Sequence, residues 1–225
     1  MSLIDLSHTI RHGEVTYKGL PAPLICDHLS RECARDVYAG AEFQIGKIEM
    51  VGNTGTYMDV PFHRYANGHD LAGLPLERVA GLEAIVVNAT EAPRGSVGEE
   101  YFESIDCRNR AVLVYTGWSR HWGTDQYFSG HSFLTEGAAI CLRDRGALLV
   151  GIDSLNIDST STGARPVHSV LLAENILVVE HLTNLGQVPA TGAVFTAVPP
   201  KVEGMGTFPV RAFARVGKTA PTPGG

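Results

Sequence analysis

The pattern of apolar residues along the chain predicts four buried strands separated by polar, glycine-containing or proline-containing segments. These strands cover residues 83–88, 111–117, 147–153 and 176–179. The run over 111–117 is apolar and rich in β-branched residues, which is typical of a parallel strand covered on both faces. The four runs together predict the sheet of one α/β domain.

Helices are predicted between these strands. Thr135 is a good N-cap for a helix that ends at Gly146. A second short helix follows Pro166 and ends at Asn175, and a third is expected near residues 98–105. The order of strand, helix and strand predicts a right-handed crossover in a parallel or mixed sheet.

Weaker patterns predict further strands on either side of these elements. They cover residues 3–10, 43–51, 193–198 and 207–215. Residues 24–42 carry several charges and predict a solvated strand or loop. Residues 118–131 are polar and aromatic and predict a long loop after a strand end, a position that is often functional.

Composition indicates one globular domain. The chain has 225 residues, of which 44% are hydrophobic, and this is enough for a sizeable core. We expect a single domain over residues 1–216 and a flexible tail, rich in Pro, Gly and Thr, over 217–225. No apolar run approaches the roughly 20 residues that a membrane span needs, so no membrane contact is expected.

Charge and cysteine content narrow the partners and the compartment. The net charge is −6 without a basic cluster, which argues against nucleic acid as the main partner. The first residues show no basic start followed by an apolar core, so we expect no signal peptide. The four cysteines form no Cys-x-x-Cys pair, which argues against a zinc knuckle or a redox motif. We therefore expect a cytoplasmic protein with free thiols.

Candidate chemistry gathers where the predicted strand over 43–51 gives way to a tight turn. Asn53, Tyr57, Asp59 and His63 follow one another there, punctuated by glycines and a proline. Asp59 and His63 can share one face of a turn, as an acid/base pair or as metal ligands. Taken alone, Asp59 also suits a turn or cap, and His63 also suits an ordinary surface histidine.

A second candidate stretch contains His168 and Glu180. His168 lies at the start of the predicted helix, and Glu180 ends the apolar run over 176–179. A carboxylate in that place needs solvent or a partner. In the predicted loop over 118–131, Trp118 and Trp122 either line a pocket or pack the loop down.

The stretch from Asn53 to His63 resembles the signature of the cyclase family of metal-dependent hydrolases, which includes bacterial kynurenine formamidase and isatin hydrolase. That signature reads His-x-Gly-Thr-His-x-Asp-x-Pro-x-His. The present chain matches its spacing and its Gly, Thr, Asp, Pro and last His. Asn53 and Tyr57 replace the first two histidines, which are metal ligands in the family. The resemblance extends from about residue 4 to about residue 215.

The family resemblance implies a metal site with a changed set of ligands. In the family, the residue matching Asp59 bridges two metals, and the residues matching His168 and Glu180 complete the shell of one of them. The other metal would lack both of its histidines here, because a neutral amide and a phenol are poor ligands for zinc. We therefore expect one divalent metal, zinc or manganese, bound by Asp59, His168 and Glu180, with Asn53 as a possible further ligand. A site without metal is the alternative.

The resemblance also implies a reaction. We expect hydrolysis of an amide, cyclic amide or lactone bond in a small, partly aromatic molecule. Metal-activated water would attack, His63 would serve as acid and base, and Tyr57 would donate a hydrogen bond to the developing oxyanion. Tyr17, Trp118 and Trp122 are the expected substrate contacts.

Two other functions and an assembly state remain as expectations from the sequence. One alternative is a metal-free lyase or isomerase that uses His63 and Tyr57 as its acid/base pair, and the other is a protein that binds a small ligand without catalysis. The resemblance implies the swivelling β/β/α fold of the family, a mixed, barrel-like sheet with short helices. It also implies a homodimer or homotetramer.

Overall fold

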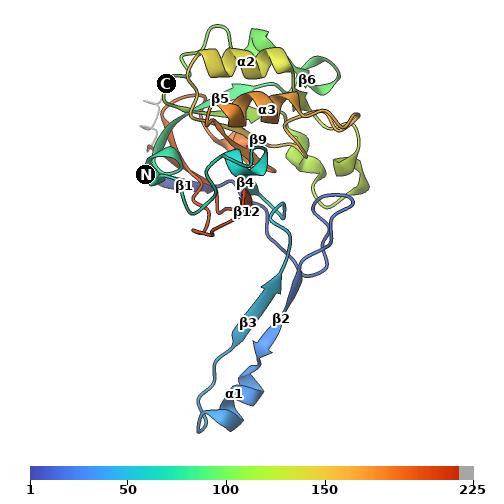
Figure 1. Ribbon diagram of the computed structural model, residues 1–225, viewed down its shortest axis with the longest axis vertical. Helices are drawn as coiled ribbons and strands as arrows, with labels where there is room; N and C mark the ends of the chain where they lie inside the picture. Colours follow the sequence, from blue (N-terminus) through green and yellow to red (C-terminus); the bar gives the residue numbers. More distant parts are fainter. Residues whose placement is uncertain (218–225) are drawn as a thin grey trace, which may run out of the picture.

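A curled sheet of nine strands forms the body of the protein, as the computed structural model in Figure 1 shows. The structure describes residues 1–217, so the predicted tail, apart from Gly217, lies outside the described residues. The strand order is β1-β13-β11-β5-β7-β9-β10-β4-β12. Its middle is formed by β5 (Leu82–Asn88), β7 (Ala111–Tyr115), β9 (Leu149–Ile152) and β10 (Leu177–Glu180). These are the four predicted buried strands, and their parallel pairing is confirmed.

Antiparallel strands extend the sheet on both sides. They are β11 (Ala193–Thr196), β13 (Phe213–Val216) and β1 (Ser2–Asp5) on one side, and β4 (Tyr57–Asp59) and β12 (Thr207–Pro209) on the other. The sequence predicts one strand over 207–215, but the structure has two. Three residues separate β12 from β13, although β12 is the last strand of the order and β13 is the second. The two edges of the sheet therefore come close together, which is why the sheet is curled.

Two helices cover one face of the sheet, α2 (Glu136–Asp144) and α3 (Pro166–Ala173) (Figure 1). The hydroxyl of Thr135 accepts a hydrogen bond from Ala138 N at 3.1 Å, which confirms the predicted N-cap. Successive residues of β7 alternate between two cores: Val112 and Val114 pack on the helix side, and Leu113 packs inside the curl. The sheet is therefore buried on both faces, as its apolar strands require.

Short elements complete the body. The helix predicted near 98–105 is a single 3₁₀ turn, Glu99–Tyr101. The predicted loop over 118–131 contains the 3₁₀ turns Trp118–His121 and Asp125–Phe128. Further 3₁₀ turns are Pro61–His63, Leu76–Arg78, Pro93–Gly95 and Leu185–Gln187, and β6 (Ser96–Val97) pairs with β8 (Phe133–Leu134). No helix in the described part of the chain is long and apolar enough to cross a membrane.

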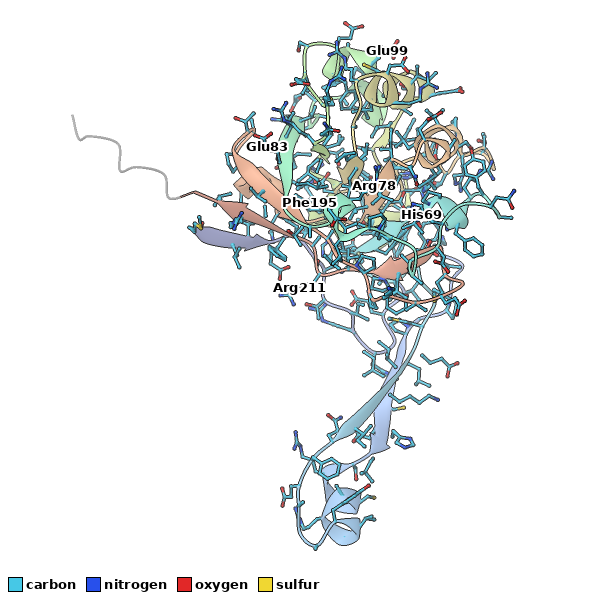
Figure 2. The ribbon with its side chains drawn as sticks, turned by 60° about the vertical axis from the view of Figure 1, so that its left-hand side comes forward. His69, Arg78, Glu83, Glu99, Phe195 and Arg211 are labelled. Atoms are coloured by element: carbon cyan, nitrogen blue, oxygen red, sulfur yellow. The ribbon has the colours of Figure 1, made fainter. Side chains whose placement is uncertain are left out.

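An arm projects from the body, as Figures 1 and 2 show. It consists of β2 (Leu24–Leu29), the helix α1 (Arg31–Val37) and β3 (Ile45–Glu49), with β2 and β3 paired antiparallel. The predicted strand over 43–51 is therefore present but forms this arm, apart from the central sheet. The helix α1 was not predicted, although the Ser30 hydroxyl caps its first turn. Within residues 1–217, β2 and β3 have no third strand beside them.

Candidate active site

The register of three strands brings four polar side chains to one face of the sheet. In the antiparallel pair β4/β10, Tyr57 lies opposite Glu180, and in the pair β4/β12, Asp59 lies opposite Thr207. Opposed residues of an antiparallel pair share a face, and so do residues two apart on one strand. All four side chains therefore point to the same side. The sequence placed Tyr57 and Asp59 in a tight turn, and this was wrong: they lie on β4, and the turn precedes them at Gly55, whose φ is +66°.

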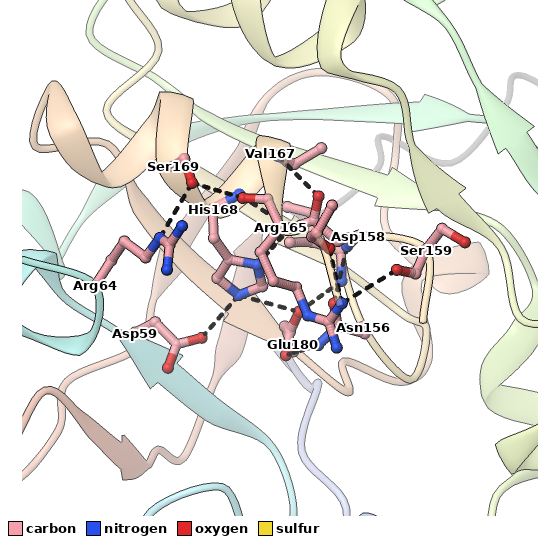
Figure 3. A network of polar contacts seen from close by, with 12 residues as sticks. Asp59, Arg64, Asn156, Asp158, Ser159, Arg165, Val167, His168, Ser169 and Glu180 are labelled. Carbon is pink, nitrogen blue, oxygen red and sulfur yellow. Dashed lines mark hydrogen bonds and ion pairs between the residues drawn. The ribbon is translucent and has the colours of Figure 1, made fainter. Parts of the chain in front are cut away.

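The helix α3 lies over this face and supplies His168 (Figure 3). Asp158, in the loop after β9, accepts hydrogen bonds from the backbone N–H groups of Val167 and His168 at 2.8 and 3.0 Å. Its Oδ2 is also 2.6 Å from His168 Nδ1. Asp158 thus fixes both the start of α3 and the orientation of the imidazole. His168 Nε2 then faces Asp59 Oδ2 at 3.4 Å and Glu180 Oε1 at 3.6 Å.

Glu180 is fully buried, and hydrogen bonds hold both of its oxygens. Oε1 accepts from the backbone N–H of Ile157 at 2.5 Å. Oε2 accepts from the hydroxyl of Tyr57 and from Asn156 Nδ2, the latter at 3.4 Å. Asp59 is equally buried, yet its Oδ2 has no hydrogen-bond partner among the described residues. A buried carboxylate oxygen without a partner is costly unless it meets a cation.

His63 reaches the same site from the 3₁₀ turn that follows β4. Its Nδ1 is 2.8 Å from the Thr207 hydroxyl, which donates its own hydrogen to Asp59 Oδ1 at 2.5 Å. A hydroxyl has one hydrogen, so Thr207 must accept a hydrogen from His63 Nδ1. We assign the neutral ring of His63 this tautomer from the network. It leaves Nε2 unprotonated and able to accept a proton.

The buried charges shift one another's pKa. Burial raises the pKa of Glu180 to about 7 against the opposing charge of His168, and the charge of Asp59 adds to the rise. Burial would lower the pKa of His168, but its hydrogen bond to Asp158 and the nearby carboxylates of Asp59 and Glu180 raise it to about 10. Burial and the charge of Glu180 hold the pKa of Tyr57 well above its usual value. Tyr57 is therefore a neutral hydrogen-bond donor here and a poor metal ligand.

A pocket of about 280 Å³ opens above these groups. Its lining consists of Tyr17, Leu20, Asn53, Tyr57, His63, Arg64, Asn156, Arg165, His168 and Glu180. The structure thus brings together the predicted residues of both candidate stretches with Tyr17. The sequence interpretation missed Asp158 and Asn156, although both lie in a polar loop at a strand end, where pocket residues often gather. It also missed Arg64, Arg165 and Thr207, for which no local signal exists.

The two tryptophans lie apart from the residues that line this pocket. Trp122 stacks on His8 with ring centroids 3.8 Å apart and packs edge-on against Tyr127 and His181. Trp118 donates from Nε1 to the backbone oxygen of Tyr127 at 3.1 Å. Trp122 therefore packs the loop over 118–131 onto the body, and Trp118 joins two parts of the loop to each other. Their expected contact with substrate stays a prediction.

The donor set fits a divalent metal. Ligand atoms of Asp59, His63 and His168 lie within 4.8 Å of one another, and Glu180 Oε1 is 3.6 Å from His168 Nε2. Two ligands about 2.1 Å from a tetrahedral ion lie roughly 3.4 Å apart, close to the separations from His168 Nε2 to the two carboxylates. The hydrogen bond that the other ring nitrogen, Nδ1, donates to Asp158 is the usual support of a metal-binding histidine. The unpartnered Asp59 Oδ2 gives the site a vacant acceptor for a cation.

The chain resembles known proteins in sequence and in fold. The family model described as putative cyclase matches residues 4–159. The chain is 28% identical to a kynurenine formamidase of Salinibacter ruber over 96% of its length and 98% of the relative, and 32% identical to that of Bordetella avium over 76% and 80%. Isatin hydrolase A from Labrenzia aggregata, solved with benzyl benzoate, shares the fold with a TM-score of 0.82 at 22% identity, over 96% of this chain and 93% of that one.

The pKa shifts predict how the stability of the metal-free protein depends on pH. The pKa of His168 rises on folding from 6.5 to about 10, so its stabilisation is complete below pH 6.5 and is lost as the pH rises toward 10. The pKa of Glu180 rises on folding from 4.5 to about 7, so its contribution to stability is complete below pH 4.5 and is lost as the pH rises toward 7. Thermal unfolding of protein treated with chelator should therefore show a midpoint that falls from pH 6 to pH 9.

The variant His168→Gln isolates this effect. Its midpoint should fall less steeply above pH 6.5 than that of the wild type, whereas His28→Gln, on the exposed arm, should follow the wild type. Added zinc should restore stability, and more so at higher pH, because the metal competes with the proton on His168. Equal pH slopes in His168→Gln and the wild type would contradict the assignment.

Proposed function

Since the chain belongs to the cyclase family, we propose that it is a metal-dependent hydrolase that cleaves an amide, cyclic amide or lactone bond in a small organic molecule. The names of the relatives support amide hydrolysis, because a formamidase cleaves a formamide. The observation that carries the proposal is the convergence of Asp59, His168 and Glu180 on one point of the pocket wall, beside His63.

We propose one divalent ion, zinc or manganese, held by Asp59, His168 and Glu180. Two carboxylates and one imidazole suit either ion. When bound, the ion supplies Lewis-acid activation of the scissile carbonyl and of water. His168 would hold the ion as a neutral ligand through Nε2, because its Nδ1 hydrogen stays with Asp158.

His63 is the acid/base group of this mechanism. Its Nε2 is the unprotonated nitrogen, and the ring lines the pocket. It accepts a proton from the attacking water and returns that proton to the leaving nitrogen or oxygen.

The structure gives Tyr57 a different role from the one that the sequence suggested. Its hydroxyl donates to Glu180, so we assign it to orienting that carboxylate, and the expected hydrogen bond to the oxyanion stays untested.

Metal analysis combined with activity tests the proposal. Wild-type protein should carry about one zinc or manganese per chain and hydrolyse members of a panel of aryl formamides, cyclic amides and lactones. Asp59→Ala and Glu180→Ala should lose both metal and activity. His63→Ala should keep the metal and lose about 10²–10⁴-fold in kcat. Loss of metal in His63→Ala would make His63 a ligand. Activity that survives complete removal of metal would favour the lyase or isomerase alternative.

Thr207 should act through His63. The hydroxyl of Thr207 bridges His63 Nδ1 and Asp59 Oδ1, so Thr207→Val should allow the ring of His63 to turn and to change tautomer. We expect kcat to fall by roughly 10–100-fold, with a change in the pH–rate profile and little change in KM. Thr207→Ser keeps the hydroxyl and should retain most of the activity. Equal losses in the two variants would indicate a packing effect instead.

We further propose that the arm packs against a second copy of this chain, as the expected homo-oligomer implies. An isolated two-stranded hairpin is marginally stable in water. The apolar side chains of the arm are 39–47% exposed at Leu24, Ile25, Ile45 and Ile48, and Figure 2 shows that the arm projects away from the body. The segment between Tyr17 and Asn53, which both line the pocket, contains the arm.

The four cysteines are free thiols, which supports the expected cytoplasmic location.

Light scattering after gel filtration tests the role of the arm. Ile25 and Ile48 are opposite each other across the arm, and Lys47 points to its other face. The double variant Ile25→Ser/Ile48→Ser should shift the wild-type dimer or tetramer toward monomer. Lys47→Ser should not. A wild type that is monomeric at all concentrations would overturn this assembly.

A further inference from the structure

Two arginines stand in the wall of the pocket. Arg64 follows directly after His63, and Arg165 precedes the first residue of α3. Both line the pocket, and Figure 3 shows them on opposite sides of the His168 ring. Neither is within 4.0 Å of a carboxylate oxygen in residues 1–217, unlike the surface arginine Arg211, which binds Asp5.

Neutral groups hold both guanidinium groups in place. Arg64 donates from Nε to the Ser169 hydroxyl at 3.1 Å, which leaves its two terminal nitrogens without an acceptor in the described residues. Arg165 donates from Nη1 to the backbone oxygens of Thr162 and Ala164 at 2.9 and 2.8 Å. These contacts fix the position of each cation but do not neutralise its charge. Each arginine therefore offers preorganised N–H donors to a ligand in the pocket.

The charge balance of the site also favours an anion. The site contains three buried carboxylates, those of Asp59, Asp158 and Glu180. With one divalent ion bound and His168 neutral, the three carboxylates leave a net charge of −1. The two guanidinium groups convert this into one net positive charge. The chain as a whole carries −6, so the positive charge is a property of the pocket and not of the protein surface.

We propose that Arg64 and Arg165 recognise a carboxylate on the substrate, which makes the preferred substrates amides or cyclic amides that carry a carboxylate away from the scissile bond. The proposal rests on the hydrolase function above and specifies its substrate class. A planar guanidinium matches a carboxylate with two parallel N–H donors. Tyr17 and Leu20 in the same lining provide apolar surface for the ring or chain between the carboxylate and the amide.

A matched pair of substrates tests this inference. The pair is 3-formamidobenzoate and its neutral counterpart 3-methylformanilide. Wild-type holoenzyme should prefer the carboxylate at least tenfold in kcat/KM, mainly through KM. Arg64→Gln and Arg165→Gln should each reduce this preference about tenfold and leave the rate on the neutral substrate within about threefold. Arg64→Lys and Arg165→Lys should keep part of the preference. Arg211→Gln removes the same charge from the surface (Figure 2) and should behave as the wild type.

Calorimetry separates this inference from the function on which it rests. Binding of benzoate and of benzamide is measured on the same proteins without any turnover. Benzoate should bind more tightly than benzamide, and each Gln variant should remove most of the difference.

If neither formamide is hydrolysed but this difference is present, the hydrolase proposal fails and carboxylate recognition holds. If the wild type hydrolyses both formamides equally well, or binds benzoate and benzamide equally, carboxylate recognition is overturned. Equal preference in the wild type and both Gln variants would also overturn the role of the arginines.

Discussion

The pairing register of β4 with β10 is the constraint on which the site depends. It sets Tyr57 opposite Glu180 and Asp59 opposite Val178, so the polar groups face α3 while Met58 and Val179 face the other core. A slip of β4 by one residue would turn Tyr57 and Asp59 into the apolar interior of the curl, away from Glu180. The alternation of polar and apolar residues on β4, with Glu180 at the end of the apolar β10, therefore secures the register. The same register gives Asp59 its fixed approach to His168.

The site also requires that the charges of its buried carboxylates be compensated. Asp59, Asp158 and Glu180 are 0–1% exposed, and carboxylates at that depth need cations or hydrogen bonds. Asp158 obtains its partners from the start of α3, and Glu180 from Tyr57 and the backbone of Ile157. Asp59 Oδ2 accepts no hydrogen bond and faces His168 Nε2 at 3.4 Å. The polar network is thus satisfied except at the point that faces His168 Nε2, and a proton or a metal ion at that point completes it.

The sequence revealed those parts of the site that local patterns determine. Pro166 marks the start of the helix that carries His168, and Glu180 stands out because it ends an apolar strand. Local patterns could not predict β4, because a strand of three residues is defined by its pairing with β10 and β12 and not by its own sequence. For the same reason Thr207 and Asp158 are ordinary polar residues in the sequence, and their roles follow from contacts over 148 and 10 residues. A loop tryptophan such as Trp122 gives no local sign of whether it faces a ligand or packs the loop.

The replacement of two family histidines by Asn53 and Tyr57 changes the electrostatics of the pocket, and the rest of the lining is consistent with that change. A protonated, buried Tyr57 occupies the position of one lost imidazole and binds Glu180 by a hydrogen bond. With the one divalent ion proposed here, in place of the two that the family resemblance implies, the pocket would carry two fewer positive charges. Arg64 and Arg165 supply two positive charges at fixed positions in the same wall. The difference is that a metal ion polarises whatever oxygen it meets, whereas guanidinium groups select a planar anion by its shape. On this reasoning, the exchange of a metal for two arginines gives up part of the Lewis-acid chemistry and gains a means of choosing among substrates by charge.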